Sequence, residues 1–528
     1  MKKNSWGKRV VYQIYPRSFN DSNGDGIGDI NGITEKLDYL TELGVTALWL
    51  SSIYCSPMHD FGYDISDYYR IDPLFGSLTD FDNLLKQAHK RDIKVMMDFV
   101  PNHTSQEHEW FQRSRKSKKD PKRDWYIWRK PRANGAAPNN WLSLFGGSAW
   151  EFDEKSGEYY LHSFDVSQPD LNWRNPKVVA EIISIMRFWL DRGVDGFRVD
   201  VAYHLYKDPF FRDEPDNPQY KINEQSQYSS LSHVYTVALP ETLEMIKRLN
   251  GVVDGYEDRF MVCEIYTFLK EIVNLYRIID HQGFAPFNFS FLSLPWDAQA
   301  HKQFIDEYDE MVGNEYFPTY VLGSHDFPRI ATKLGEHQAR TAAVLQLTLR
   351  GIPFIYYGEE LGMKNRDIPK EQIKDPIALR THGTSFGRDP VRTPMQWDSS
   401  EYAGFSDVEP WLPLENEYRS RNVATEKPDP TSFLNLYTSM LLLRNTRESL
   451  SQGKYIPFAC TNPEIFGFFR RGEKEETFVL ANFSKKSQEH ELPHGNWTIL
   501  LSTESATGQE KVSNQLILKP FEAVVLSE

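Results

Sequence analysis

Five short segments of this chain place acidic, basic or histidine side chains at the end of an apolar run. Burying an unpaired charge costs several kcal/mol, so such side chains need a cleft or a partner. Charged side chains that follow successive apolar strands are typical of barrel enzymes, whose active sites lie at the carboxyl ends of the strands. The segments are 97–103 (MDFVPNH), 196–200 (GFRVD), 261–265 (MVCEI), 321–326 (VLGSHD) and 387–389 (GRD).

Two of these acids have the types and positions that glycosidic bond cleavage requires. That reaction uses one carboxylate at the anomeric carbon and one carboxylic acid that protonates the departing oxygen. Asp200 and Glu264 end the fourth and fifth apolar runs. Arg198 lies two residues before Asp200, on the same strand face, and is expected to keep Asp200 ionised. Glu264 follows Met-Val-Cys and is expected to carry the proton.

Asp326 with His325, and Asp98 with His103, add two further polar pairs at strand ends. Histidines beside acids at such positions favour hydrogen bonding to substrate hydroxyls. The alternative is that all these carboxylates only form structural ion pairs within the barrel. The coincidence of several acids and polar partners at successive strand ends favours the chemical interpretation.

Apolar runs of strand length alternate with amphipathic stretches of helix length, which predicts parallel βα units. Helices are expected at 33–43, 78–91 and 176–192. Eight such units predict an α/β protein with a (β/α)₈ TIM barrel. The eight expected strands are 10–15, 47–50, 94–99, 196–199, 260–265, 287–289, 319–322 and 353–357.

Two regions break this alternation. Residues 104–172 are too long for a structureless loop and are expected to form an inserted small domain after the third strand. Short alternating runs from residue 451 to 528 predict a C-terminal antiparallel β-sandwich. The barrel is therefore expected to comprise residues 1–103 and 173–450.

Composition narrows the classes of partner. The net charge of −14 argues against nucleic acid and anionic membranes. The three cysteines include no CxxC pair, which argues against a disulfide framework or a cysteine zinc site. The beginning of the sequence lacks the apolar stretch of a signal peptide, and no run is long enough for a membrane span. We expect a cytoplasmic protein, either a monomer or a homodimer.

Over its whole length the chain resembles glycoside hydrolase family 13, the α-amylase family, and within it the α-glucosidase and oligo-1,6-glucosidase group. The resemblance implies that Asp200 is the nucleophile, Glu264 the general acid/base and Asp326 the third carboxylate of a retaining enzyme. It also implies a covalent glucosyl–Asp200 intermediate and no organic cofactor. The sugar-binding residues implied by the matching motifs are Asp60, Tyr63, His103, Arg198, His325 and Arg388.

Within that set the resemblance implies more specific roles. Tyr63 in the segment 60–64 (DFGYD) would be a stacking platform for glucose, and Asp60 would pair with Arg388 to close the pocket end. The segment 168–172 (QPDLN) resembles the motif of the oligo-1,6-glucosidase group. One departure is Ser324, which precedes His325 where asparagine is frequent in relatives.

The acidic segment 21–29 (DSNGDGIGD) places oxygen donors at alternate positions, as a hard cation requires. Position twelve of this segment is Gly32, which argues against an EF-hand. The resemblance implies a structural Ca²⁺ or Mg²⁺ site, whereas the alternative is a solvated acidic turn. The implied ligands are Asp21, Asn23, Asp25, the Ile27 carbonyl and Asp29.

The leading interpretation is an exo-acting α-glucosidase on short gluco-oligosaccharides, with possible transglucosylation. Val201 and Ala202 follow Asp200, and this pattern leaves α-1,4 and α-1,6 preference open, with a lean towards α-1,4 or mixed activity. The alternatives are an oligo-1,6-glucosidase and the glucosyl transfer of trehalose synthases and sucrose isomerases. An arginine-rich isomerase signature is not evident in 380–388. A non-catalytic sugar-binding subunit is disfavoured because all three acids are present.

Overall fold

The computed structural model describes residues 5–222, 224–381, 387–504 and 510–528. In this part of the chain, eight parallel strands form one sheet in the order β11-β10-β9-β5-β2-β1-β13-β12. Nearly every residue of these strands is buried, as expected for strands covered on both faces. The strands are β1 (Val11–Ile14), β2 (Ala47–Leu50), β5 (Lys94–Phe99), β9 (Gly196–Val199), β10 (Phe260–Cys263), β11 (Phe284–Pro286), β12 (Thr319–Val321) and β13 (Ile352–Tyr356).

A side chain joins the two ends of this sheet. The hydroxyl of Thr319, the first residue of β12, donates to the Pro286 carbonyl at the end of β11 and accepts the N–H of Asn288. The sheet is therefore closed into a barrel by side-chain bonds at the position where no β11–β12 ladder is recorded. The predicted (β/α)₈ barrel is confirmed.

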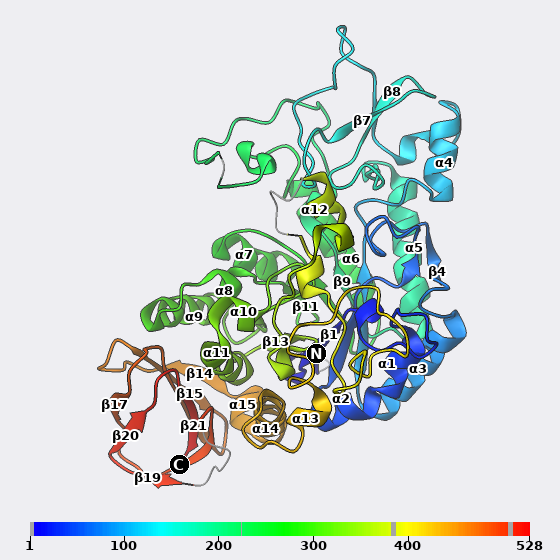
Figure 1. The fold of residues 1–528 in the computed structure, drawn as a ribbon. Helices are drawn as coiled ribbons and strands as arrows, with labels where there is room; N and C mark the ends of the chain where they lie inside the picture. The colour runs from blue at the N-terminus through cyan, green and yellow to red at the C-terminus, as the bar shows by residue number, and fades with distance from the viewer. Residues whose placement is uncertain (1–4, 223, 382–386, 505–509) are drawn as a thin grey trace.

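Helices surround the barrel (Figure 1). Their ends follow local sequence signals: in α5 the Asn175 side chain caps the first turn, Pro176 begins the helix, and Gly193 ends it with φ of 109°. The main helices are α1 (Ile30–Glu35), α2 (Leu37–Leu43), α3 (Leu78–Lys90), α5 (Pro176–Arg192), α6 (Pro240–Asp254), α7 (Leu269–Ile279), α9 (Ala298–Val312), α11 (Glu336–Thr348) and α14 (Phe433–Thr446).

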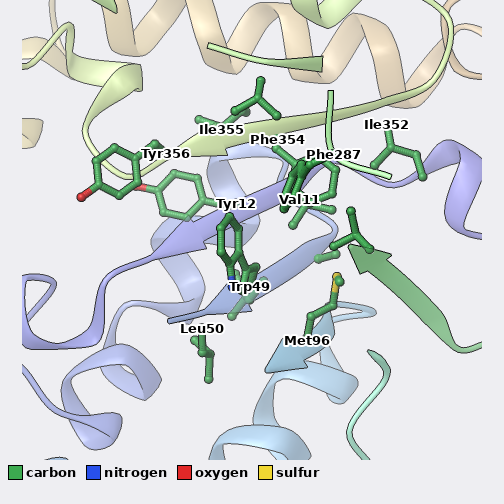
Figure 2. Close-up of a cluster of buried hydrophobic side chains, with 14 of the residues drawn as sticks. Val11, Tyr12, Trp49, Leu50, Met96, Phe287, Ile352, Phe354, Ile355 and Tyr356 are labelled. Atoms are coloured by element: carbon green, nitrogen blue, oxygen red, sulfur yellow. The ribbon is translucent and has the colours of Figure 1, made fainter. Parts of the chain in front are cut away.

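The barrel interior is rich in aromatic side chains. The Phe287 ring packs edge-on against Phe354 at a centroid distance of 4.6 Å and is tilted against Trp49 at 5.4 Å. Figure 2 shows these rings with Val11 and Met96 between the strands. Rings of this size bury large apolar areas, so the barrel interior is a packed core. The polar side chains that could take part in a reaction therefore gather at the carboxyl ends of the strands.

Between β5 and β9 the chain forms a region outside the barrel sheet, at the position where the inserted domain 104–172 was predicted. It contains α4 (Glu109–Lys116) and a small antiparallel sheet of β6 (Trp128–Arg129), β8 (Glu158–Leu161) and β7 (Trp150–Asp153). The loop after β9 also packs on it: the Trp141 indole donates to the Arg212 carbonyl, and Phe211 lies 5.5 Å from the Trp141 ring. The sequence analysis did not predict this second contribution.

The C-terminal region consists of antiparallel strands, as predicted. Within residues 454–504 and 510–528 a six-stranded sheet contains β14 (Lys454–Pro457), β15 (Ile465–Arg471), β16 (Glu476–Asn482), β21 (Ala523–Ser527), β18 (Trp497–Ser502) and β19 (Lys511–Val512). A second pair, β17 (Gln488–Glu491) and β20 (Gln515–Leu518), completes a separate apolar core around Phe478 and Trp497. This domain lies away from the strand ends that carry the candidate site (Figure 1).

Two element predictions were wrong in detail. The sixth strand is Phe284–Pro286, whereas the sequence analysis placed it at 287–289. The run Phe287-Asn-Phe289 looked more strand-like, but the strand ends at Pro286, and Phe287 packs in the barrel core against Phe354. The predicted helix 33–43 is divided into α1 and α2 at Lys36.

In the described residues, no helix is long and apolar enough to cross a membrane.

Candidate active site

The acids predicted from the sequence meet at the carboxyl end of the barrel. Asp200 follows β9 directly, Glu264 follows β10, and Asp326 lies beyond β12. The parallel register pairs Arg198 with Asp98 of β5 on one side and with Val262 of β10 on the other. Neighbouring strands therefore deliver these side chains to one place, as the barrel topology requires.

Arg198 is the centre of the first group of charges. Its Nη1 lies 2.5 Å from Asp200 Oδ1 and 2.9 Å from Asp98 Oδ1, and its Nη2 lies 2.9 Å from Glu264 Oε1. Asp200 and Glu264 are 7% and 4% exposed. One guanidinium thus serves three buried carboxylates, and the two predicted catalytic acids share it.

The protonation of this group differs from the sequence-based expectation. Burial raises the pKa of Asp200 well above its usual range, with Glu264 and Asp98 adding to the shift and Arg198 opposing it. Burial likewise raises the pKa of Asp98 to about 6, against the effect of Arg198. Arg198 lowers the pKa of Asp200, in the direction that was predicted, but burial and the neighbouring acids outweigh it because one positive charge cannot offset three buried negative ones.

Glu264 is held by two hydrogen bonds and an ion pair. Its Oε2 accepts the Val201 N–H at 2.9 Å, and its Oε1 accepts the Tyr266 hydroxyl at 2.6 Å and pairs with Arg198 Nη2 at 2.9 Å. Val201 has φ of 40°, an unusual conformation for a β-branched residue. That turn directs the N–H after Asp200 towards Glu264, so the backbone itself links the two acids.

A hydrogen-bonded chain runs from Gln13 to Asp98. The Gln13 amide nitrogen lies 2.8 Å from His325 Nδ1, so Nδ1 accepts and Nε2 carries the hydrogen. His325 Nε2 lies 2.8 Å from the Tyr63 hydroxyl, which donates to Asp98 Oδ2 at 2.6 Å. Burial lowers the pKa of His325 well below its usual range, so the ring is neutral. These residues are fixed in orientation.

Tyr63 was predicted as a platform for a sugar ring. In the structure it stacks on His325 with a centroid distance of 5.4 Å and an interplanar angle of 5°. His103 lies on the same side of the site, where its Nε2 contacts the Tyr63 carbonyl at 3.2 Å and burial lowers its pKa to about 4. The structure brings both residues into the site, and their contact with sugar stays a prediction.

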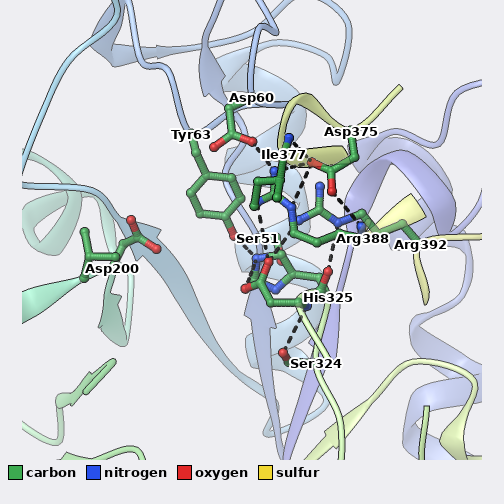
Figure 3. A network of polar contacts seen from close by, with 12 residues as sticks. Ser51, Asp60, Tyr63, Asp200, Ser324, His325, Asp375, Ile377, Arg388 and Arg392 are labelled. Carbon is green, nitrogen blue, oxygen red and sulfur yellow. Dashed lines mark hydrogen bonds and ion pairs between the residues drawn. The ribbon is translucent and has the colours of Figure 1, made fainter. Parts of the chain in front are cut away.

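A second group of charges surrounds Arg388 (Figure 3). Its Nη2 lies 2.6 Å from Asp60 Oδ1 and 2.6 Å from Asp375 Oδ1, and its Nη1 lies 3.6 Å from Asp326. The predicted contact between Asp60 and Arg388 is present. Arg392 adds a bond of 3.0 Å to Asp326.

This second group contains firmly ionised acids. Burial opposes ionisation of Asp326, but the positive charges of Arg392 at 3.0 Å and Arg388 at 3.6 Å hold its pKa well below its usual range. Arg388 does the same for Asp375, against the effect of burial. Asp60 is the exception, since burial raises its pKa despite Arg388.

The inserted domain contributes to the same end of the site. Gln168, from the segment that resembles the oligo-1,6-glucosidase motif, donates to Asp60 Oδ2 at 3.1 Å. Asp60 is thus bonded by a barrel loop residue, Arg388, and by the inserted domain. The function of that segment in this structure is to anchor the acid that was predicted to line the innermost sugar position.

Sequence reasoning missed four residues of the site. Asp375 and Arg392 lie in the irregular region after β13, where no strand pattern indicates a position in space. Gln13 lies inside β1 and was read as part of an apolar run. Tyr266 was overlooked, although its spacing of two residues from Glu264 is a signal that could have been used.

The predicted metal loop is bound mainly to itself. The Asp21 carboxylate accepts the N–H groups of Asn23, Gly24 and Gly26 and the Ser406 hydroxyl, and Asp29 caps α1 through Gly32. In the described ranges no group of three or more His, Cys, Asp or Glu side chains is arranged to hold a metal ion. The donor types suit a hard cation, and the metal site stays a prediction.

Comparisons with known proteins agree with this geometry. The model of the α-amylase catalytic domain matches residues 13–453, and that of the α-amylase SusG C-terminal domain matches 465–525. An oligo-1,6-glucosidase from Heyndrickxia coagulans is 39% identical over 98% of both chains. An α-glucosidase from Apis mellifera is 40% identical over 91% of this chain and 85% of that protein.

Among solved structures, the α-glucosyl transfer enzyme XgtA superimposes with a TM-score of 0.91 at 38% identity, covering all of both chains. The match spans the barrel, the inserted domain and the C-terminal sheet together. Sequence motifs, barrel architecture and these matches lead to one conclusion: the chain belongs to the α-amylase family of glycoside hydrolases, in the group that contains α-glucosidases and oligo-1,6-glucosidases.

Proposed function

We propose that the protein is a retaining, exo-acting α-glucosidase that hydrolyses terminal α-glucosidic bonds of short gluco-oligosaccharides. The observation that carries this proposal is the pair Asp200 and Glu264, delivered by neighbouring strands and bonded to the same guanidinium of Arg198. Two carboxyl groups this close suit a double displacement through a glycosyl-enzyme intermediate. The names of the relatives support the same substrate class.

In the first step Asp200 attacks C1 of the terminal glucose while Glu264 gives its proton to the departing oxygen. The positive charge that develops at C1 favours the ionised form of Asp200, as nucleophilic attack requires. In the second step ionised Glu264 takes a proton from water, which attacks C1 and releases Asp200. The configuration at C1 is retained after two inversions.

The second group of charges supports the exo mode. We propose that Asp326 binds hydroxyl groups of the same glucose, and that Asp60 with Arg388 and Gln168 closes the end of the pocket. These bonds of 2.6 Å and 3.1 Å link the Asp60 loop to Arg388 and to Gln168, and we expect them to block a longer chain beyond the terminal glucose.

Glucosyl transfer is the second candidate. It is favoured by the match to the α-glucosyl transfer enzyme XgtA over the full length of both chains. The intermediate would be the same, and a sugar or another alcohol would replace water. Part of the loop 380–388, in which an isomerase signature was sought, lies outside the described residues.

A substrate panel tests the proposal and separates the candidates. Maltose, isomaltose, sucrose, trehalose and panose are each incubated with the enzyme, and the products are followed by NMR. We expect release of α-glucose before mutarotation, with α-1,4 or mixed α-1,4 and α-1,6 activity. Initial release of β-glucose would contradict retention, whereas new disaccharides at low sugar concentration would favour transfer.

A structural Ca²⁺ or Mg²⁺ bound by the loop 21–29 stays our proposal. It is supported by the alternation of oxygen donors and by Asn23 and Asp25, which lie exposed beside the bonded Asp21. Thermal melts with and without a chelator test it: we expect Tm to fall on chelation and to recover on addition of the cation. An unchanged Tm would favour the alternative, a solvated acidic turn.

The cytoplasmic location also stays a prediction, testable by cell fractionation.

A further inference from the structure

The hydroxyl of Tyr266 contacts the predicted general acid directly. It donates to Glu264 Oε1 at 2.6 Å, and Arg198 Nη2 forms an ion pair with the same oxygen at 2.9 Å. The other oxygen, Oε2, accepts the Val201 N–H at 2.9 Å. A carboxyl oxygen has two lone pairs, so Oε2 keeps one for a proton, whereas Oε1 faces both the Tyr266 hydroxyl and the Arg198 guanidinium.

The Tyr266 ring is held in place by residues from two other strand ends. It stacks on Phe289, after β11, with a centroid distance of 4.8 Å and an interplanar angle of 13°. Phe327, next to Asp326, lies 6.1 Å from the Tyr266 ring and 5.3 Å from Phe289. Tyr266 is nevertheless 52% exposed. A half-exposed ring that is fixed by two neighbours can hold its hydroxyl at one position.

We propose that Tyr266 is a positioning residue for the general acid, which fixes the carboxyl of Glu264 so that Oε2 carries the proton and faces the leaving oxygen. This inference rests on the proposed function. In the step concerned, the proton moves from Oε2 to the departing oxygen as the C1–O bond breaks and the Asp200–C1 bond forms. The hydrogen bonds from Tyr266 and the Val201 N–H, with the ion pair to Arg198, then stabilise the carboxylate that remains, which can accept a proton from water.

Leaving groups of different basicity separate this role from a merely structural one. Maltose releases a poor, alkoxide-type leaving group that requires protonation, whereas a nitrophenyl α-glucoside releases a good one that requires little. If the proton is wrongly placed, the rate of maltose hydrolysis therefore falls, whereas the rate of aryl glucoside hydrolysis changes little. A general loss of folded enzyme reduces both rates equally.

The test compares Tyr266→Phe with wild type on both substrates. The variant keeps the ring and its stacking on Phe289 and loses only the hydroxyl. We expect kcat/KM for maltose to fall about tenfold and kcat/KM for the nitrophenyl glucoside to change less than about twofold. The ratio of the two values is internal to one preparation, so it does not depend on the folded fraction.

Tyr256→Phe is the matched control, because the Tyr256 hydroxyl also donates to a carboxylate, that of Asp191, at 2.6 Å and lies on the outer helices. This control is expected to keep the wild-type ratio. An unchanged ratio in Tyr266→Phe, or an equal fall on both substrates, would overturn the inference. A wild-type enzyme inactive on every α-glucoside would instead refute the proposed function, so the two failures are distinguishable.

Discussion

Two groups of buried charges lie side by side in the candidate site, and they differ in their balance. Around Arg198, one guanidinium contacts three carboxylates, those of Asp98, Asp200 and Glu264. Around Arg388 and Arg392, two guanidiniums contact three carboxylates. The first group has too little positive charge to ionise all its acids, and the second has enough to fix Asp326 as an anion.

This difference in charge balance suggests that the two groups have different functions within one pocket. Acids whose pKa is raised by burial hold protons near neutral pH and can exchange them during a reaction. Acids that are firmly ionised by arginines provide constant hydrogen-bond acceptors, which suit the binding of sugar hydroxyls. We therefore assign proton transfer and bond cleavage to the group around Arg198, and recognition of glucose to the group around Arg388.

The largest expected effect is in the first group. Asp200→Asn removes the proposed nucleophile and is expected to lower kcat on maltose about 10⁴-fold or more, as loss of a covalent nucleophile does elsewhere. The substitution also removes a buried carboxylate from an overcrowded group, so Tm should stay the same or rise. Steady-state kinetics and a thermal melt check both points. A folded variant with the wild-type rate would refute the assignment.

A moderate effect on binding is expected in the second group. Arg388→Lys keeps the charge but loses the fork that bonds Asp60 and Asp375 together. We expect KM for maltose to rise about tenfold with kcat within about threefold of wild type.

Arg350→Lys is the control for that substitution. Its side chain is similarly buried and bonds Asp309 at 2.6 Å, but it lies before β13, away from the carboxyl ends of the strands. The control should leave both kinetic constants unchanged. If Arg388→Lys lowered kcat and left KM unchanged, the division between the two groups would fail.

The smallest expected effect concerns stability alone. Glu359, after β13, is buried, and burial raises its pKa from 4.5 to about 8, with Arg329 opposing the shift. Below pH 4.5 the acid is protonated in both states and its contribution is complete. As pH rises towards 8, the unfolded chain ionises first, so this stability is lost within that window.

In the Glu359→Gln variant the side chain at this position cannot ionise, so this pH-dependent loss of stability is absent. Relative to the variant, wild type should lose on the order of a few kcal/mol of unfolding free energy between pH 5 and pH 8. Tm measured at several pH values for both proteins checks the difference. A constant difference across that range would show that Glu359 does not titrate in this window.

The sequence was sufficient for features that depend on local pattern. Asp200 and Glu264 end apolar runs, and the alternation of strands and helices predicted the barrel that brings them together. Protonation was not predictable, because the pKa of Asp200 depends on burial and on Asp98 and Glu264 across the strands. Asp375 and Arg392 were missed because an irregular segment gives no periodicity from which a position could be inferred. The misplaced sixth strand has the same origin: a three-residue strand ending in Pro286 carries too little pattern.

The most direct test of the account is to trap the covalent intermediate. Wild-type enzyme is incubated with a ring-fluorinated α-glucosyl fluoride, which forms the glycosyl-enzyme readily and hydrolyses slowly, and the digested protein is analysed by mass spectrometry. The account predicts one glycosyl label, on the peptide that contains Asp200, and no label in Asp200→Asn. A label on Glu264 or elsewhere, or complete turnover of the reagent with no label at any time, would contradict it.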